Sequence, residues 1–390
     1  MNRLGARTRT ALAAALVLGL AAGPVAAGPA LAHPAPTASH QAFGPDTEAL
    51  RAAIAGLPSA DTTAALVRVS GKGRDWQGSS GVHDLASGRP ADPDARFRAG
   101  SVTKVFTAAT VLRLAAEGRV DLNRPVRAYL PADIPAAYDT VTVRQLLNHT
   151  HGIPAPDSVG RNLEEWYAHR FDLRSARAAV ASATSPTKEG EHTVPGTVQK
   201  YGNIGYTIAG LLIEKVSGTS YEEAVARRIL RPLGLHGTYF PGSNPRIEGP
   251  HNHGYQVFPK PDGSTELRDV SVWGTTEAWA AGDLVSTTAD LETFLKALFR
   301  GQVVRGPLLE EMFTVPDIEG ANMSAGLQRF DAGNGQILWL KTGGRWGYNA
   351  IIAAPRDLSR TLVHSVNSTD AKGKDMNPTA VRILRAAFSR

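Results

Sequence analysis

Cysteine is absent from the 390-residue sequence. This absence excludes a thiol nucleophile, a zinc-thiolate site and disulfide bonds. The chain must therefore hold its fold together by packing of the core. A hydrophobic content of 42% is ordinary for a globular protein and allows a sizeable core.

A strong net charge is also lacking, because the formal charge is only +6 at pH 7. Three of the basic residues, Arg3, Arg7 and Arg9, belong to an N-terminal segment that we expect to be removed, and subtracting them leaves +3. No basic run with interleaved aromatic residues is present. We therefore expect neither nucleic acid nor an anionic membrane surface as a partner.

Long hydrophobic runs are scarce, and the longest is the stretch of twelve residues from Ala11 to Ala22. A membrane span needs about 20 apolar residues. The basic start, the short apolar stretch and the small residues ending at Ala32 are typical of a secretory signal peptide at residues 1–32. No later segment is long enough to span, so we expect the mature chain in the extracellular space or the cell envelope.

Residues 33–45 are rich in proline, alanine and serine and predict a flexible linker, followed by one folded domain over residues 46–390. A short helix is expected from Asp46 to Ala55. Alternating β-rich runs near both ends of the chain predict one antiparallel sheet, and a final helix is expected from Pro378 to Phe388. The predicted strands cover residues 64–70, 75–84, 336–343, 348–355 and 360–367.

The middle of the chain reads as mostly helical, with helix-ending glycines at Gly118, Gly218 and Gly301. The sequence thus predicts an α/β (α+β) fold of two lobes. Its antiparallel sheet has five or more strands and is flanked by the N- and C-terminal helices. An all-helical lobe is inserted over roughly residues 110–270. A cleft between two such lobes is a natural place for a site.

A candidate nucleophile stands in the stretch FRAGSVTKVFTAA, where Ser101 begins the expected helix and Lys104 follows one turn later. A serine hydroxyl needs a nearby base, and a lysine can be one when burial or neighbouring cations lower its pKa. Ser101 could equally be a helix cap. The same spacing recurs at Ser185 and Lys188, but prolines and glycines around that copy predict a loop.

Two further short motifs add chemistry. Tyr201 and Asn203, in KYGNIG, offer a phenol for proton transfer and a carboxamide for a substrate amide; a buried tyrosine and a turn-forming asparagine are the alternative. Lys341 and Thr342 precede Gly343 and Gly344 at the end of a predicted strand. A cation and a hydroxyl there could bind a carboxylate, while the glycines would let a strand-like substrate approach closely.

Together and in this order, the three motifs resemble those of the penicillin-recognising serine hydrolases, and more narrowly the secreted D-alanyl-D-alanine carboxypeptidases and class C β-lactamases. The resemblance extends from about Asp46 to the C-terminus. It implies that Ser101 is acylated, that Lys104 activates it and that Tyr201 carries the proton to the leaving group. It also implies that Asn203 orients the substrate.

The same resemblance implies that Lys341 and Thr342 support the protonation network and bind the substrate carboxylate. It also implies that the N–H groups of Ser101 and Gly344 form the oxyanion hole. Gly343 belongs to the same substrate-binding strand end. Trp279 is expected to line the cleft, with a core position as the alternative. Arg329 is a candidate for clamping the substrate carboxylate, although its spacing is loose.

Some features depart from the carboxypeptidase pattern. Those enzymes often have histidine where Lys341 stands, and the residue at Gly202 is often serine or alanine. We therefore expect a secreted serine hydrolase. The first hypothesis is a D-alanyl-D-alanine carboxypeptidase that acts on peptidoglycan stem peptides. A β-lactamase or related esterase or amidase stays open, as does a binding protein for β-lactams or cell-wall peptides that does not turn them over.

No metal or other cofactor is expected. The pairs His149 and His151, and His251 and His253, lack a third ligand at workable spacing and do not share a helix face. We expect a monomer whose partners are stem peptides or β-lactams.

Overall fold

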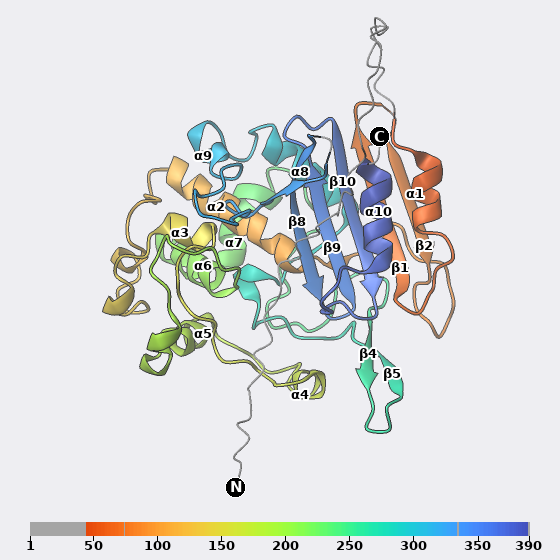
Figure 1. Ribbon diagram of the computed structural model, residues 1–390, viewed down its shortest axis with the longest axis horizontal. Coiled ribbons are helices and arrows are strands. Elements are labelled where there is room, and N and C mark those ends of the chain that lie inside the picture. Colours follow the sequence, from red (N-terminus) through yellow and green to blue (C-terminus); the bar gives the residue numbers. More distant parts are fainter. Residues whose placement is uncertain (1–43, 74, 334, 389–390) are drawn as a thin grey trace, which may run out of the picture.

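A six-stranded sheet forms the centre of the fold in the computed structural model, which describes residues 44–73, 75–333 and 335–388 (Figure 1). Its strand order is β2-β1-β10-β9-β8-β7, and every neighbouring pair is antiparallel. The strands are β1 (Thr62–Gly71), β2 (Trp76–Gly81), β7 (Gln328–Asp331), β8 (Ile337–Arg345), β9 (Tyr348–Ala354) and β10 (Arg360–Ser368). Because β1 pairs with β10, the two ends of the domain share one sheet, as predicted.

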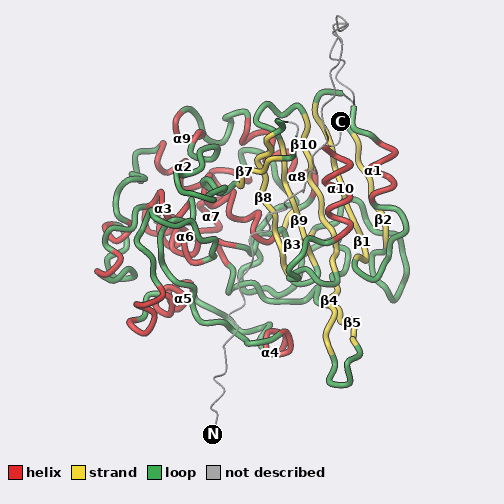
Figure 2. Tube along the Cα trace, in the orientation of Figure 1, coloured by secondary structure: helices red, strands yellow, loops and turns green. Residues whose placement is uncertain are grey.

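Helices cover both faces of this sheet. On one face, α1 (Thr47–Ala53) and α10 (Pro378–Phe388) lie side by side, and their apolar residues form a core with those of β1, β9 and β10 (Figures 1 and 2). On the other face lie α8 (Thr288–Phe299) and α2 (Thr103–Ala116). The predicted terminal helices and the mixed α/β fold with a sheet of five or more strands are thereby confirmed.

The helical region between β3 and β6 packs against the second face through α2. It contains α3 to α7, and α9 follows α8; their bounds are α3 (Val143–Leu147), α4 (Leu163–Ala168), α5 (Ala176–Ala183), α6 (Ile204–Ser217), α7 (Tyr221–Val225) and α9 (Pro307–Glu310). The expected glycine at the end of α6 is Gly218, whose φ of 72° closes the helix in the left-handed conformation.

The region predicted to be all-helical also contains a hairpin, β4 (Tyr255–Pro259) and β5 (Thr265–Asp269), which projects from the domain (Figure 1). A short pairing of β3 (Phe97–Arg98) with β6 (Val285–Ser286) leads directly into the turn that carries Ser101. Within the described residues, no helix is both long and apolar enough to cross a membrane. The predicted signal peptide and almost all of the linker lie outside the described residues.

The position of Ser101 depends on the burial of α2. Residues Thr103 to Leu112 of this helix are all buried, so α2 runs through the middle of the domain between the sheet and the helical region. Ser101 itself lies in a 3-10 turn, Gly100–Val102, and the α-helix begins only at Thr103. The sequence prediction of Ser101 as the first helical residue is therefore wrong by two residues, although the one-turn spacing to Lys104 is kept.

Candidate active site

Two side chains contact the hydroxyl of Ser101. Lys104 Nζ lies 3.2 Å from Ser101 Oγ, and Tyr201 Oη donates a hydrogen bond to the same oxygen at 2.8 Å. Lys104 and Tyr201 come from α2 and from the loop before α6, which are far apart in sequence. Ser101 is only partly buried and lines a cavity of about 370 Å³. The hydroxyl is thus accessible and has two candidate proton acceptors.

Lys104 is completely buried and held in one position. Its Nζ also donates to Asn203 Oδ1 at 2.8 Å and to the carbonyl of Ala281 at 2.7 Å. Burial lowers the pKa of Lys104 to about 8, while the neighbouring Tyr201 opposes the fall and the charge of Lys341 adds to it. A lysine with such a pKa can exchange a proton near neutral pH.

Tyr201 lies between two amines. Lys104 Nζ and Lys341 Nζ are 5.1 Å and 4.8 Å from the centre of its ring. Burial alone would raise the pKa of Tyr201, but the two positive charges outweigh it and lower the pKa to about 7. A substantial fraction of this phenol is therefore ionised at neutral pH, and as a phenolate it can accept the proton of Ser101.

The backbone around Ser101 is fixed by glycines. Gly100 has a φ of 53°, and a Cβ there would collide with the backbone nitrogen of Gly344. A Cβ on Gly343 would collide with the carbonyl oxygen of Ala99 and lie 3.0 Å from the nitrogen of Ser101. The turn and β8 therefore pack backbone against backbone, and the backbone nitrogens of Ser101 and Gly344 both lie at this contact. The missing side chain of Gly343 thus lets the backbone of Ala99 approach β8, whereas the sequence suggested that it would let a substrate approach.

Asn203 and Thr342 line the same cavity as Ser101, Tyr201 and Lys341. The pairing of β7 with β8 stops at Leu340, so no described strand pairs with the outer edge of β8 from Lys341 to Arg345. Lys341 Nζ donates to the carbonyl of Thr342 at 3.1 Å. The structure thus gathers eight of the predicted residues, Ser101, Lys104, Tyr201, Asn203, Lys341, Thr342, Gly343 and Gly344, at one place.

Two predicted residues lie elsewhere. Trp279 packs against Gly210 of α6 and against the ring of Tyr221, and its Nε1 donates to Glu222 Oε1 at 2.8 Å. It belongs to the packing of the helical region, not to the residues that line the cavity. Arg329 is exposed on β7, and its strand neighbours Gln328 and Phe330 line the cavity instead. Because successive strand residues face opposite sides, Arg329 points to the other face of the sheet from these two, the face on which its partner Trp339 packs.

His149, which the sequence offered only as a rejected metal ligand, lines the cavity. Its ring lies 4.7 Å from the ring of Tyr201, and it adopts a φ of 63°. Burial, followed by the nearby charge of Lys104, lowers its pKa well below the usual value, so the imidazole is neutral. It forms an uncharged wall for Tyr201. Nothing in the local sequence distinguishes it from the neighbouring His151.

The second serine and lysine pair is not part of this site. Residues Pro186–Glu191 form a 3-10 helix, so the predicted loop is wrong at this point; Pro186 suits its first position and Ser185 caps it. Ser185 Oγ contacts Thr187 Oγ1, and Lys188 Nζ pairs with Asp157 at 3.0 Å. The lysine is therefore engaged by a carboxylate and its charge is stabilised.

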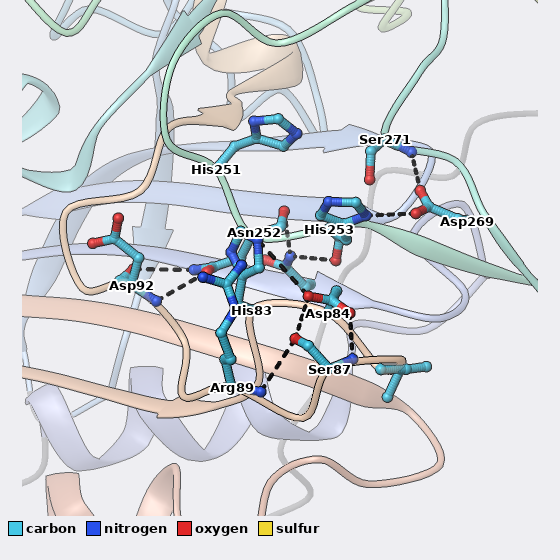
Figure 3. Close-up of polar contacts among 12 residues, drawn as sticks. His83, Asp84, Ser87, Arg89, Asp92, His251, Asn252, His253, Asp269 and Ser271 are labelled. Carbon is cyan, nitrogen blue, oxygen red and sulfur yellow. Dashed lines mark hydrogen bonds and ion pairs between the residues drawn. The ribbon is translucent and has the colours of Figure 1, made fainter.

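The histidines of the HNH segment bind neighbouring protein groups. Figure 3 shows His253 directed at Asp269, and His253 Nδ1 lies 2.6 Å from Asp269 Oδ2. His251 Nδ1 lies 2.9 Å from the carbonyl of Gly249. No group of three or more histidine, aspartate or glutamate side chains in the described part of the chain is arranged to hold a metal ion.

The fold, together with a partly accessible serine between a buried lysine and a tyrosine, defines a penicillin-recognising serine hydrolase. Sequence comparison agrees with this class. The family model described as Beta-lactamase matches residues 50–386, and the chain belongs to this family.

Individual proteins that are similar to this chain agree with the assignment. A D-stereospecific amidohydrolase from Streptomyces sp. has a crystal structure that matches with a TM-score of 0.77 and 30% identity, over 88% of this chain and 99% of that one. Penicillin-binding protein 4* of Bacillus subtilis (strain 168) is 25% identical over 309 residues, 75% of this chain and 65% of its own length. Protein flp of Staphylococcus aureus (strain COL) is 28% identical over 223 residues, which cover 55% of this chain. The match spans only 41% of the length of flp.

Proposed function

We propose that this serine hydrolase cleaves the amide bond that follows a D-amino acid, through an acyl-enzyme on Ser101. The observation that carries the proposal is the contact of one accessible hydroxyl with both Lys104 Nζ and Tyr201 Oη. The similarity to the D-stereospecific amidohydrolase from Streptomyces sp., which extends over 99% of that chain, supports D-stereospecific amide cleavage. Peptides that end in D-alanyl-D-alanine are the first substrate to test.

In the proposed reaction, Ser101 Oγ attacks the amide carbon while its proton passes to the Tyr201 phenolate. The oxyanion that forms is stabilised by the N–H groups of Ser101 and Gly344, and one such donor is worth roughly 3 kcal/mol in other enzymes. Tyr201 then returns the proton to the leaving amine as the C–N bond breaks. Water, deprotonated by the same phenolate, releases the acyl group and restores the serine.

The free edge of β8 supports an extended substrate. A peptide can add to an unpaired strand edge through its backbone, with side chains directed to either face. Asn203 lines the same cavity as this edge and can hold the acyl amide. β-Lactam hydrolysis is the second candidate, supported by Lys341, which is the choice of the β-lactamases at this position.

Substitution of the nucleophile tests the proposal. Ser101→Ala is expected to abolish both labelling by a fluorescent penicillin and release of D-alanine from a D-alanyl-D-alanine peptide, as followed by mass spectrometry. Ser185→Ala is the matched control and should retain both activities. Labelling that survives Ser101→Ala would remove the assignment, and so would loss of activity in Ser185→Ala.

We also propose that the mature enzyme lies outside the cytoplasm, because residues 1–32 have the pattern of a secretory signal peptide. N-terminal sequencing of the exported protein should find His33 as the first residue. A monomeric state stays a prediction, to be checked by light scattering of the purified chain.

A further inference from the structure

The cavity that contains Ser101 continues past the catalytic residues to the face of the sheet covered by α10. Side-chain alternation along β8 explains this extent. Trp339 packs in the core of the α2 face, whereas Leu340 packs in the core of the α10 face. Lys341 therefore points toward the helical region, and Thr342 points toward α10. The cavity passes around the edge of β8 between the two.

The α10 side of the cavity is predominantly apolar. We call this part the α10 pocket, and its wall consists of Phe330, Leu340, Ile351, Met376, Ala380 and Leu384. These residues come from β7, β8, β9 and α10 with the loop before it, so the pocket is built from rigid elements of the sheet face. Met376 and Leu384 are partly exposed, while Leu340, Ile351 and Ala380 are buried.

His364 adds a polar group to this pocket. It lies on β10, is 2% exposed and lines the cavity. Its Nδ1 has no hydrogen-bond partner among the described residues. Burial lowers its pKa to about 3, so the ring is neutral at physiological pH. The proposed reaction does not use this imidazole, and an unpaired polar atom at such depth is unfavourable unless a ligand satisfies it.

The charged residues of the segment that lines the cavity before α10 sum to no net charge. The cavity-lining segment Asp370 to Asp375 carries Lys372 and Lys374 together with two aspartates. Selection by net charge is therefore weak here, and shape and apolar contact must decide what enters.

We propose that the α10 pocket receives a bulky, mainly apolar side chain on the leaving amino acid of the substrate. This rests on the proposed function, because it needs an amide substrate whose leaving group carries a side chain. The resemblance assigns the substrate carboxylate to Thr342, and in a peptide the terminal carboxylate belongs to the leaving residue. Since Thr342 points toward α10, the leaving residue lies at the entrance of the α10 pocket.

The proposal predicts selectivity for D-leucine, D-phenylalanine or D-tyrosine over D-alanine as the leaving residue. Burying a side chain of that size favours the larger substrate by roughly tenfold to a hundredfold over one that leaves the pocket empty. The D-tyrosine hydroxyl can in addition donate to His364 Nδ1, so D-tyrosine should be preferred to D-phenylalanine.

The experiment measures kcat/KM of the full chain for N-acylated D-alanyl-D-Xaa dipeptides, with Xaa alanine, leucine, phenylalanine or tyrosine. Met376→Trp narrows the pocket and is expected to lower the ratio of D-phenylalanine to D-alanine at least tenfold. Val381→Trp is the matched control on α10, because Val381 is partly exposed and does not line the cavity. His364→Leu should remove the preference for D-tyrosine over D-phenylalanine, with thermal unfolding checking that the variant is folded.

A second series keeps D-alanine as the leaving residue and varies the acyl residue. The proposal is overturned if Met376→Trp affects this series instead, if the wild type shows no preference among leaving residues, or if Val381→Trp changes the ratio as much as Met376→Trp does. In each of these cases the peptides are still cleaved and the proposed function stands. If the wild type cleaves none of the dipeptides and Ser101 is not acylated by any, both proposals fall.

Discussion

At the scale of single residues, the site depends on how two amines share one phenol. Lys104 and Lys341 both lower the pKa of Tyr201, and Lys341 also lowers the pKa of Lys104. The proposed active form has Tyr201 as the phenolate and Lys104 as the ammonium. Since the pKa values are about 7 and about 8, kcat/KM should rise through the first and fall through the second.

Lys341→Ala tests this coupling. Loss of one positive charge removes an influence that lowers both pKa values, so both limbs of the pH profile should move to higher pH. The measurement is kcat/KM from about pH 5 to about pH 10 with a substrate that does not ionise in that range. Lys260→Ala, at an exposed site beside the β4–β5 turn, is the control and should leave the limbs in place. A profile of Lys341→Ala with unchanged limbs would contradict the assigned roles.

At the scale of helices and strands, the sequence predicted those elements whose bounds depend on neighbouring residues in the chain. The final helix has the predicted bounds, Pro378–Phe388, because its first residue and its apolar spacing are both encoded locally. The strands of the sheet were found within a few residues by their alternation, except for β7, whose four residues are too few to show a pattern.

Features decided by contacts distant in sequence were the ones missed. The 3-10 turn at Ser101 exists because Gly100 and Ala99 pack on the backbone of β8, and neither contact is visible in FRAGSVTK. Trp279 is drawn into the helical region by Glu222, which lies on α7. The direction of Arg329 follows from the register of β7 with β8. The residues of the candidate site could be found together because their motifs are short stretches whose residue types suggest the chemistry.

Gly343→Ala tests the contact between the turn and β8. The added Cβ would displace Ala99 and the nitrogen of Ser101, and with them the paired N–H donors. We expect kcat/KM to fall by about two orders of magnitude, as when an oxyanion donor is removed. Gly202→Ala is the matched control, because a Cβ there meets no heavy atom within 4 Å, and its activity should stay near that of the wild type. Equal losses in both variants would contradict the role given to Gly343.

At the scale of the whole molecule, a chain without cysteine keeps its catalytic elements in place by packing α2 and α8 between the sheet and the helical region. One buried carboxylate connects α8 to strand β1 of this sheet: Glu292 accepts from Arg68 at 2.9 Å and from Lys296 at 3.1 Å, and it also contacts Ser70. Arg68 and Ser70 belong to β1. Removing the carboxylate takes a partner from the buried Ser70 and leaves the partly exposed Arg68 and Lys296 without their counter-ion.

Glu292→Ala is therefore expected to lower the free energy of unfolding by about 3 kcal/mol at pH 7. Burial alone would raise the pKa of Glu292, but hydrogen bonds from Ser70, Arg68 and Lys296 outweigh it and hold the pKa below its usual 4.5. A depressed pKa contributes stability above the unfolded value that is lost as the pH falls through the folded one. The difference between wild type and variant, measured by urea denaturation, should thus shrink below pH 4.5. Glu310→Ala, in an exposed pair with Arg356, should cost less than about 1 kcal/mol, and a difference for Glu292→Ala that does not change with pH would contradict the role of its charge.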